Sequence, residues 1–188
     1  MKVLIVYGTT EGQTAKIANF VGNRLILQHH QAVTTDVALG MEATDPAGFD
    51  AILIAASVHA GHYQPGVIEY IQQHLGAITT RHNAFLSVSL AAAGHDPEDQ
   101  AGLEHCVAQF CKETGWTPER VHHLAGAFRY TQYDFLKRWA MKYIAYRKGA
   151  PTDTGRDYEL TDWDDVARFV DTFTATAPEL EKRSLAAN

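Results

Sequence analysis

The sequence predicts an α/β protein built on a doubly wound, five-stranded parallel sheet in the order 2-1-3-4-5. Short apolar runs alternate along the chain with stretches of helical periodicity, a pattern typical of parallel strands joined by right-handed crossovers. The 188 residues suffice for one such domain, and they contain no internal repeat or low-complexity linker. In this strand order a ligand crevice lies at the carboxyl ends of strands one and three.

The predicted strands are short apolar runs, and the predicted helices carry apolar residues at helical spacing. The strands are Val3–Tyr7, Ala32–Val37, Ala51–Ala56, Ala84–Leu90 and Val121–Phe128. The helices are Ala15–Gln28, Gly66–Leu75, Glu98–Thr114 and Asp162–Thr174. The segment Gly40–Phe49 is too short, and too interrupted by Asp and Pro, to predict a helix there.

We predict a single domain over residues 1–176, with an insertion at 129–161 between the fifth strand and the last helix, and a flexible tail at 177–188. The insertion is far longer than a typical connection of a few residues. Its root lies at the carboxyl end of the sheet, beside the crevice. It therefore has to be explained by function as well as by topology.

The first part of the insertion, Arg129–Lys148, is basic and amphipathic. Six of its residues are Lys or Arg and one, Asp134, is acidic. An apolar stripe recurs at helical spacing, and its members are Phe135, Leu136, Trp139, Ala140, Tyr143 and Ile144. This pattern indicates an element at an anionic membrane surface. The alternative is a stripe packed on the domain's own core, but the position beside the crevice favours a lid or a membrane-facing substrate site.

Composition excludes several classes of protein. A formal net charge of −6 at pH 7 argues against a general nucleic-acid binder. Cys106 and Cys111 have no metal-binding spacing, and we predict no metal site. No apolar run approaches the ~20 residues that span a bilayer. Because an apolar strand pattern begins at the N-terminus, we expect no signal peptide. We expect a cytoplasmic protein, and its oligomeric state, monomer or homo-oligomer, stays open.

The first strand leads directly into the turn Thr9-Thr10-Glu11-Gly12-Gln13-Thr14, which precedes the first helix. A strand, a hydroxyl- and glycine-rich turn and a helix are typical of a phosphate site, because N–H groups at the helix start and the helix dipole favour an anion. No Lys precedes Thr14, which excludes a nucleoside triphosphate loop, and no G-x-G-x-x-G motif is present. The turn suits one phosphate monoester, which points to FMN. Ordinary helix capping is the alternative.

Two further loops emerge at the same edge of the sheet and are rich in small residues, which let a flat ring approach the backbone. We predict that they bind the flavin ring through Ser57, Val58, His59, Ala60, Gly61, Ser89, Leu90, Ala91 and Ala92. His59 is a weak candidate for proton transfer, since imidazole titrates near neutral pH. A simple polar contact is the commoner role for a loop histidine.

Five short motifs, in order along the chain, are shared with one family of flavoproteins. They are Glu11-Gly12-Gln13-Thr14, Ala56-Ser57 with Gly61-His62-Tyr63, Gly126-Ala127-Phe128-Arg129-Tyr130, Thr152-Asp153-Thr154 and Thr161-Asp162-Trp163. With these motifs the chain resembles the quinone-dependent protoporphyrinogen oxidases, haem-biosynthesis enzymes with a flavodoxin-like fold. The first motif occurs in all flavodoxin-like proteins, whereas the later ones discriminate.

The resemblance implies FMN as cofactor and oxidation of protoporphyrinogen IX to protoporphyrin IX. It also implies that electrons pass to menaquinone or ubiquinone at the cytoplasmic face of the inner membrane, where the protein would be peripheral. The cations Arg129, Lys137 and Arg138 are then candidates to bind the substrate's propionates. Tyr130 and Tyr133 are candidates for contacts with its ring.

Two other functions stay open from the sequence. A flavodoxin-type electron carrier, which serves a protein partner, is favoured by the acidic loop Ala91–Asp99, whereas the cationic insertion argues against it. A quinone reductase fed by NAD(P)H is the other, but the sequence carries no nucleotide-binding motif for it.

Overall fold

The computed structural model describes residues 1–37, 44–94, 97–129, 153 and 155–186, and their side chains as far as Ala177. Its five-stranded sheet has the order β2-β1-β3-β4-β5, with every neighbouring pair parallel. The strands are β1 (Lys2–Gly8), β2 (Gln31–Asp36), β3 (Ala51–Ser57), β4 (His82–Ser89) and β5 (Val121–Ala125). The predicted fold class and strand order are confirmed.

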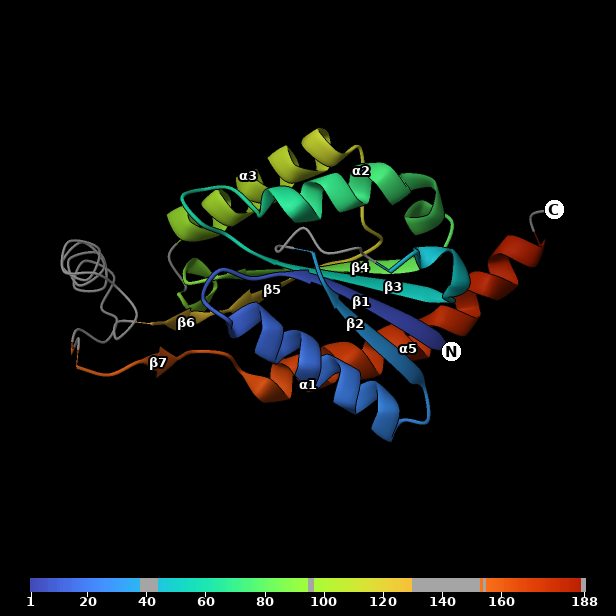
Figure 1. Ribbon diagram of the computed structural model, residues 1–188, viewed down its shortest axis with the longest axis horizontal. Helices are drawn as coiled ribbons and strands as arrows, with labels where there is room; N and C mark the ends of the chain where they lie inside the picture. The colour runs from blue at the N-terminus through green and yellow to red at the C-terminus, as the bar shows by residue number, and fades with distance from the viewer. Residues whose placement is uncertain (38–43, 95–96, 130–152, 154, 187–188) are drawn as a thin grey trace.

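Helices cover both faces of the sheet, as the alternation of strands and helices predicts (Figure 1). The helices are α1 (Gln13–Leu27), α2 (Pro65–Thr79), α3 (Pro97–Thr114) and α5 (Trp163–Ala186), with short 3₁₀ turns η1 (Pro46–Gly48) and η2 (Ala91–Ala93). Helices α1 and α5 lie on one face, and α2 and α3 lie on the other. Helix α5 continues beyond Thr174, where the predicted periodicity ends, while the flexibility of the tail stays a prediction.

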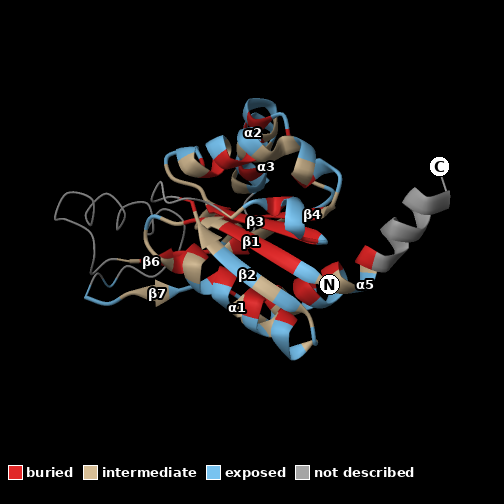
Figure 2. Cartoon of the chain, turned by 45° about the vertical axis from the view of Figure 1, so that its right-hand side comes forward, coloured by how far each residue is buried: buried red, intermediate tan, exposed pale blue. Residues whose placement is uncertain are grey.

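The core is two apolar layers separated by the sheet. Val3 and Ile5 of β1 point to the layer under α1 and α5, whereas Leu4 and Val6 point to the layer under α2 and α3. Alternation along a strand places successive side chains on opposite faces, and burial on both faces explains why these strands read as continuous apolar runs. The central strands are accordingly buried along most of their length (Figure 2).

The predicted fifth strand divides at Gly126. Residues 121–125 form β5 in the main sheet, whereas β6 (Ala127–Phe128) leaves it and pairs antiparallel with β7 (Tyr158–Glu159). The backbone N–H of Gly126 donates to Ser89 and its carbonyl accepts from Leu160, so the chain turns out of the sheet here. The ribbon of β6 and β7 extends from the carboxyl end of the sheet and forms the two roots of the insertion (Figure 1). Residues 130–152 and 154 of the insertion lie outside the described residues.

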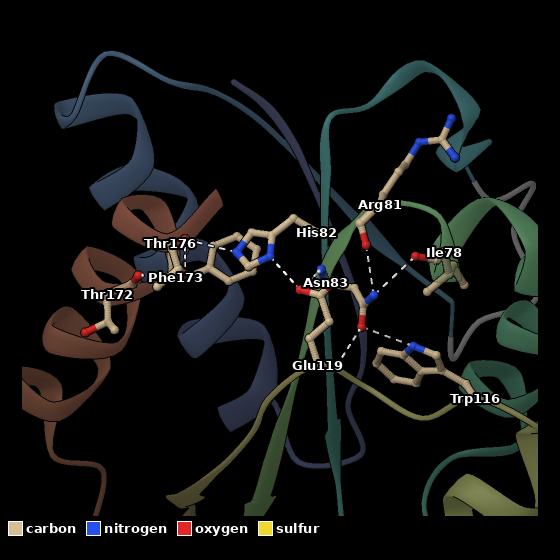
Figure 3. Close-up of polar contacts among 9 residues, drawn as sticks. All are labelled: Ile78, Arg81, His82, Asn83, Trp116, Glu119, Thr172, Phe173 and Thr176. Atoms are coloured by element: carbon tan, nitrogen blue, oxygen red, sulfur yellow. Dashed lines mark hydrogen bonds and ion pairs between the residues drawn. The ribbon is translucent and has the colours of Figure 1, made fainter. Parts of the chain in front are cut away.

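A buried polar network closes the opposite end of the sheet (Figure 3). The side-chain oxygen of Asn83 accepts from the Trp116 indole at 3.2 Å and from the backbone N–H of Glu119 at 3.1 Å. Its amide nitrogen donates to the carbonyl of Arg81 at 2.9 Å, and the residue is 2% exposed. Asn83 therefore provides a partner to the buried Trp116 indole and joins it to the backbone of Arg81 and Glu119.

Substitution of Asn83 should be costly for this reason. Asn83→Ala should lower the free energy of unfolding by about 3 kcal/mol, because it removes several buried hydrogen bonds and leaves the Trp116 indole unpaired. Urea unfolding measures the change. The matched control is Asn23→Ala at an exposed position of α1, for which a change within about 0.5 kcal/mol is expected. Equal unfolding midpoints for the two variants would contradict the assigned role.

Candidate functional site

A cavity of about 640 Å³ opens at the carboxyl end of the sheet, between the loops after β1, β3 and β4 and the first turns of α3. All three loops predicted to bind a ligand contribute to its walls. The predicted residues that line it are Thr9, Glu11, Gln13, Thr14, Ser57, Val58, His59, Ala60, Gly61, Ser89, Leu90 and Ala91. Thr10, Gly12 and Ala92 belong to the same loops but are not among the lining residues. The topology thus brings together residues that lie far apart in the sequence.

The turn at residues 9–14, here called the phosphate turn, leaves the start of α1 uncapped. Gly12, at the N-cap position, has a φ of 86° and makes no side-chain cap, and its own N–H donates to the Thr9 hydroxyl at 3.0 Å. A Cβ at Gly12 would meet nothing within 4 Å, so the left-handed backbone, rather than space, requires glycine here. The N–H groups of the first helical turn have no intrahelical acceptor. They are therefore available to an anion.

The Thr14 side chain supports the same interpretation. It is 1% exposed, it lines the cavity, and its hydroxyl has no hydrogen-bond partner in the described part of the chain. A buried hydroxyl without a partner costs free energy, so a ligand that brings an acceptor to this atom would be favoured. Uncapped amides and an orphaned hydroxyl together fit one phosphate group.

The loop after β3 is a tight hairpin turn. His59 and His62 exchange backbone hydrogen bonds of 2.8 and 3.0 Å, and Ala60 and Gly61 between them have φ values of 50° and 83°. Two successive residues with positive φ are typical of a type I′ turn. For Ala60 this backbone conformation is uncommon, and such strain is concentrated at functional sites. The turn presents small residues to the cavity.

Tyr63 anchors the end of this loop. Its hydroxyl bonds Ser87 of β4 at 2.8 Å, and its ring packs against Phe85 and Phe110. Burial raises the pKa of Tyr63 to about 12, although the bond to Ser87 acts in the opposite direction. The phenol therefore stays neutral at physiological pH, and its role is to hold the loop.

Gln64 connects the phosphate turn with the loop after β3, and sequence analysis did not identify it. Its side-chain oxygen accepts from the backbone N–H of Ser57 at 3.2 Å. Its nitrogen donates to the hydroxyls of Ser57 at 2.6 Å and Thr10 at 3.2 Å. The Ser57 hydroxyl in turn lies 3.1 Å from Nε2 of His59. The only sequence signal was an amide residue directly before Pro65, at the start of α2.

Helix α3 supplies the outer wall, which sequence analysis also did not identify. Glu98, Asp99, Gly102, Leu103 and Cys106 face the cavity. Periodicity predicts the helix but not which neighbour each face meets. With Glu11, the wall brings three carboxylates to the cavity, and none of the described lining residues is Lys or Arg.

Arg129 is the one described residue of the five predicted to bind substrate or membrane. Its Nη2 donates to the Gln13 side chain at 3.1 Å, and its Nη1 lies 3.6 Å from the carboxylate of Asp157. The other four, Tyr130, Tyr133, Lys137 and Arg138, lie outside the described residues. Within the described chain, no cluster of three or more metal-ligating side chains occurs, and no helix is long and apolar enough to cross a membrane.

Comparison with known proteins agrees with this geometry. The flavodoxin domain family matches residues 4–155. The chain is 33% identical over 172 residues to the protoporphyrinogen IX dehydrogenase (quinone) of Escherichia coli (strain K12), which covers 90% of this chain and 92% of that protein. The chain belongs to the flavodoxin-like protoporphyrinogen IX dehydrogenase family. The family member of the same name from Leishmania major is 30% identical over 176 residues, 93% of this chain and 75% of that protein.

Solved flavodoxins share the fold of the present chain at low sequence identity. Oxidised flavodoxin 2 from Bacillus cereus matches with a TM-score of 0.55 and 18% identity, over 94% of this chain and 99% of that one. Flavodoxin 1 of the same organism matches with a TM-score of 0.54 and 13% identity, over 93% and 98%. A flavodoxin domain implies that the chain binds a flavin, and the cavity beside the phosphate turn is where the described residues fit one.

The Thr14 hydroxyl should matter for the ligand and not for the fold. Thr14→Val, which keeps the shape, should weaken FMN binding about tenfold while leaving riboflavin, which lacks the phosphate, almost unaffected. The stability of the flavin-free protein should be unchanged or up to ~1 kcal/mol higher, because an unpartnered hydroxyl is lost. Fluorescence titration and urea unfolding measure the two effects.

Thr114→Val is the matched control. Thr114 is also buried, but its hydroxyl donates to the carbonyl of Phe110 at 2.8 Å. This variant should lose about 2 kcal/mol of stability, because it also leaves the buried Trp116 backbone N–H, which donates to this hydroxyl at 3.2 Å, without a partner. It should keep its affinity for FMN. A Thr14→Val protein that binds FMN as tightly as the wild type would show that the phosphate lies elsewhere.

Proposed function

We propose that this protein binds FMN and oxidises protoporphyrinogen IX to protoporphyrin IX, passing the electrons to a membrane quinone. The observation that carries the proposal is the uncapped phosphate turn with the orphaned Thr14 hydroxyl, which opens into a cavity walled by two further loops. Relatives at 30% and 33% identity, named protoporphyrinogen IX dehydrogenase (quinone), support the substrate and the acceptor.

The phosphate turn would hold the ester end of FMN. Backbone N–H groups at the start of α1 and the Thr14 hydroxyl donate to the phosphate, and the helix dipole favours its charge. Glu11, in the same turn, carries a negative charge, so among the described lining residues the backbone amides and the Thr14 hydroxyl are the groups that attract the phosphate. The described lining contains no Lys or Arg to replace them.

The loops after β3 and β4 would hold the flavin ring through their backbone. The chemistry that FMN supplies when bound is reversible acceptance of hydrogen and electrons, and the protein supplies placement and access. None of the described lining residues is Phe, Tyr or Trp, so no such ring covers the cavity from these walls. A large flat substrate would therefore have room to approach.

His59 is the titratable ring of the loop after β3. Its Nε2 faces the Ser57 hydroxyl, which accepts a hydrogen bond from Gln64. The hydroxyl keeps its own proton and a second acceptor position, so it can donate to Nε2 or accept from it. His59 would then hold or release a proton at the edge of the cavity.

The insertion would provide the substrate and membrane side. Its cations at Lys137 and Arg138, with Arg129 at its root, match the propionates of the substrate and anionic lipid headgroups in charge. Tyr130 and Tyr133 would contact the substrate ring, and the protein would be peripheral on the cytoplasmic face of the membrane. Reversing the charges of Lys137, Arg138 and Lys142 should abolish binding to anionic vesicles; unchanged binding would remove the membrane proposal.

The substrate proposal is tested by anaerobic mixing of the FMN-loaded protein with protoporphyrinogen IX. The visible absorbance of the flavin should bleach as porphyrin fluorescence appears, and menaquinone or ubiquinone should restore the absorbance. Heat-inactivated protein, and free FMN at the same concentration, control for spontaneous oxidation. A flavin that stays oxidised with protoporphyrinogen IX would rule out this activity.

A flavodoxin-type electron carrier is the second candidate. The acidic wall of Glu98 and Asp99 favours it, because carriers of this type present acidic surfaces to their partners. The same experiment separates the two functions. If a reductase protein reduces the flavin readily while protoporphyrinogen IX does not, the carrier is the better assignment.

A further inference from the structure

We propose that Arg129 is a positioning residue for the phosphate turn, which it orders through Gln13 and to which it adds a positive charge. This inference rests on the proposed binding of FMN. It concerns the ester end of the cofactor and is independent of the substrate.

The Gln13 side chain is held at both ends. Its nitrogen donates to the Thr161 hydroxyl at 2.9 Å, and that hydroxyl donates to the carbonyl of Ala125 at 2.7 Å. Its oxygen accepts from Nη2 of Arg129 at 3.1 Å. These three hydrogen bonds run in one direction, from Arg129 through Gln13 and Thr161 to the carbonyl of Ala125. The partners therefore determine which way the Gln13 amide is oriented.

Burial makes this chain of contacts rigid. Gln13 is 5% exposed, Thr161 is 9% exposed, and the Arg129 side chain is 16% exposed. Gln13 is also the first residue of α1 and lines the cavity. A side chain fixed on both sides therefore fixes the backbone of the residue whose N–H begins the anion site.

A positive charge beside the phosphate turn suits the anion that the turn would hold. The described lining carries the carboxylates of Glu11, Glu98 and Asp99, and none of it is Lys or Arg. A phosphate monoester brings further negative charge into the same space. The guanidinium of Arg129 reaches the phosphate turn through Gln13, from a partly buried position where solvent screens it less than at the surface.

Arg129 also connects the phosphate turn to the β6–β7 ribbon at the root of the insertion. Phe128 of β6 pairs with Tyr158 of β7, and the next position outward brings Arg129 beside Asp157, with a closest distance of 3.6 Å between their charged groups. Lys16 of α1 binds Glu159 of β7 at 2.8 Å. One guanidinium therefore contacts both the phosphate turn and the β6–β7 ribbon at the root of the insertion.

The test compares FMN with riboflavin, which has the same ring and no phosphate. Flavin-free protein is titrated with each ligand, and quenching of flavin fluorescence gives the two dissociation constants. Arg129→Gln should weaken FMN binding about tenfold and change riboflavin binding less than about twofold. Arg129→Lys keeps the charge but cannot contact Gln13 and Asp157 with two separate nitrogens. Its FMN affinity should lie between those of Arg129→Gln and the wild type.

Arg24→Gln is the matched control. Arg24 is also a cation that contacts a carboxylate, that of Asp171, but it lies in the last turn of α1, away from the cavity. This variant should bind both ligands as the wild type does. Retained riboflavin binding in Arg129→Gln and Arg129→Lys shows that the variants are folded.

Equal losses of FMN and riboflavin affinity in the Arg129 variants would assign Arg129 to the fold alone and overturn the proposal. Unchanged affinity for both ligands, or a wild type that does not prefer FMN to riboflavin, would overturn it as well. If FMN is preferred and lost as expected while protoporphyrinogen IX fails to bleach the flavin, the substrate proposal falls and this inference stands.

Discussion

The uncapped start of α1 is the constraint on which the rest of the site depends. A parallel sheet ordered β2-β1-β3-β4-β5 reverses its winding at β1, and this reversal leaves a crevice between the carboxyl ends of β1 and β3. Helix α1 begins in that crevice with Gly12 in a left-handed conformation and no side-chain cap. The backbone N–H groups there require an acceptor. A phosphate meets this requirement in both charge and geometry.

The surrounding structure holds the phosphate turn from two sides. Gln64 reaches it from the loop after β3 through Thr10, and Arg129 reaches it from the root of the insertion through Gln13. Gln64, which follows the loop after β3, and Arg129, at the root of the insertion, thus contact the same short segment. In this arrangement the cofactor would be placed relative to both the ring loops and the insertion by a few directed hydrogen bonds.

Sequence reasoning succeeded where local pattern and topology determine the outcome. The central strands β1, β3 and β4 are buried on both faces, so their apolar runs are continuous, and the alternation of strands with helices predicts parallel pairing. The turn at residues 9–14 could be placed beside the crevice because its residues are contiguous and follow β1 directly. Sequence reasoning failed where contacts join distant residues. Gln13 and Thr161 are 148 positions apart, and no pattern in either segment indicates the pair. The division of the fifth strand at Gly126 likewise depends on its pairing with residues near 160.

The central claim is that the amides at the start of α1 bind the phosphate of FMN. Amide NMR of the ¹⁵N-labelled protein tests it most directly, with FMN and riboflavin added in separate titrations. The account predicts large downfield shifts of the Gln13 and Thr14 amide protons with FMN, and not with riboflavin, while amides of the loops after β3 and β4 respond to both. Equal responses of the Gln13 and Thr14 amides to the two ligands, or none to either, would contradict it.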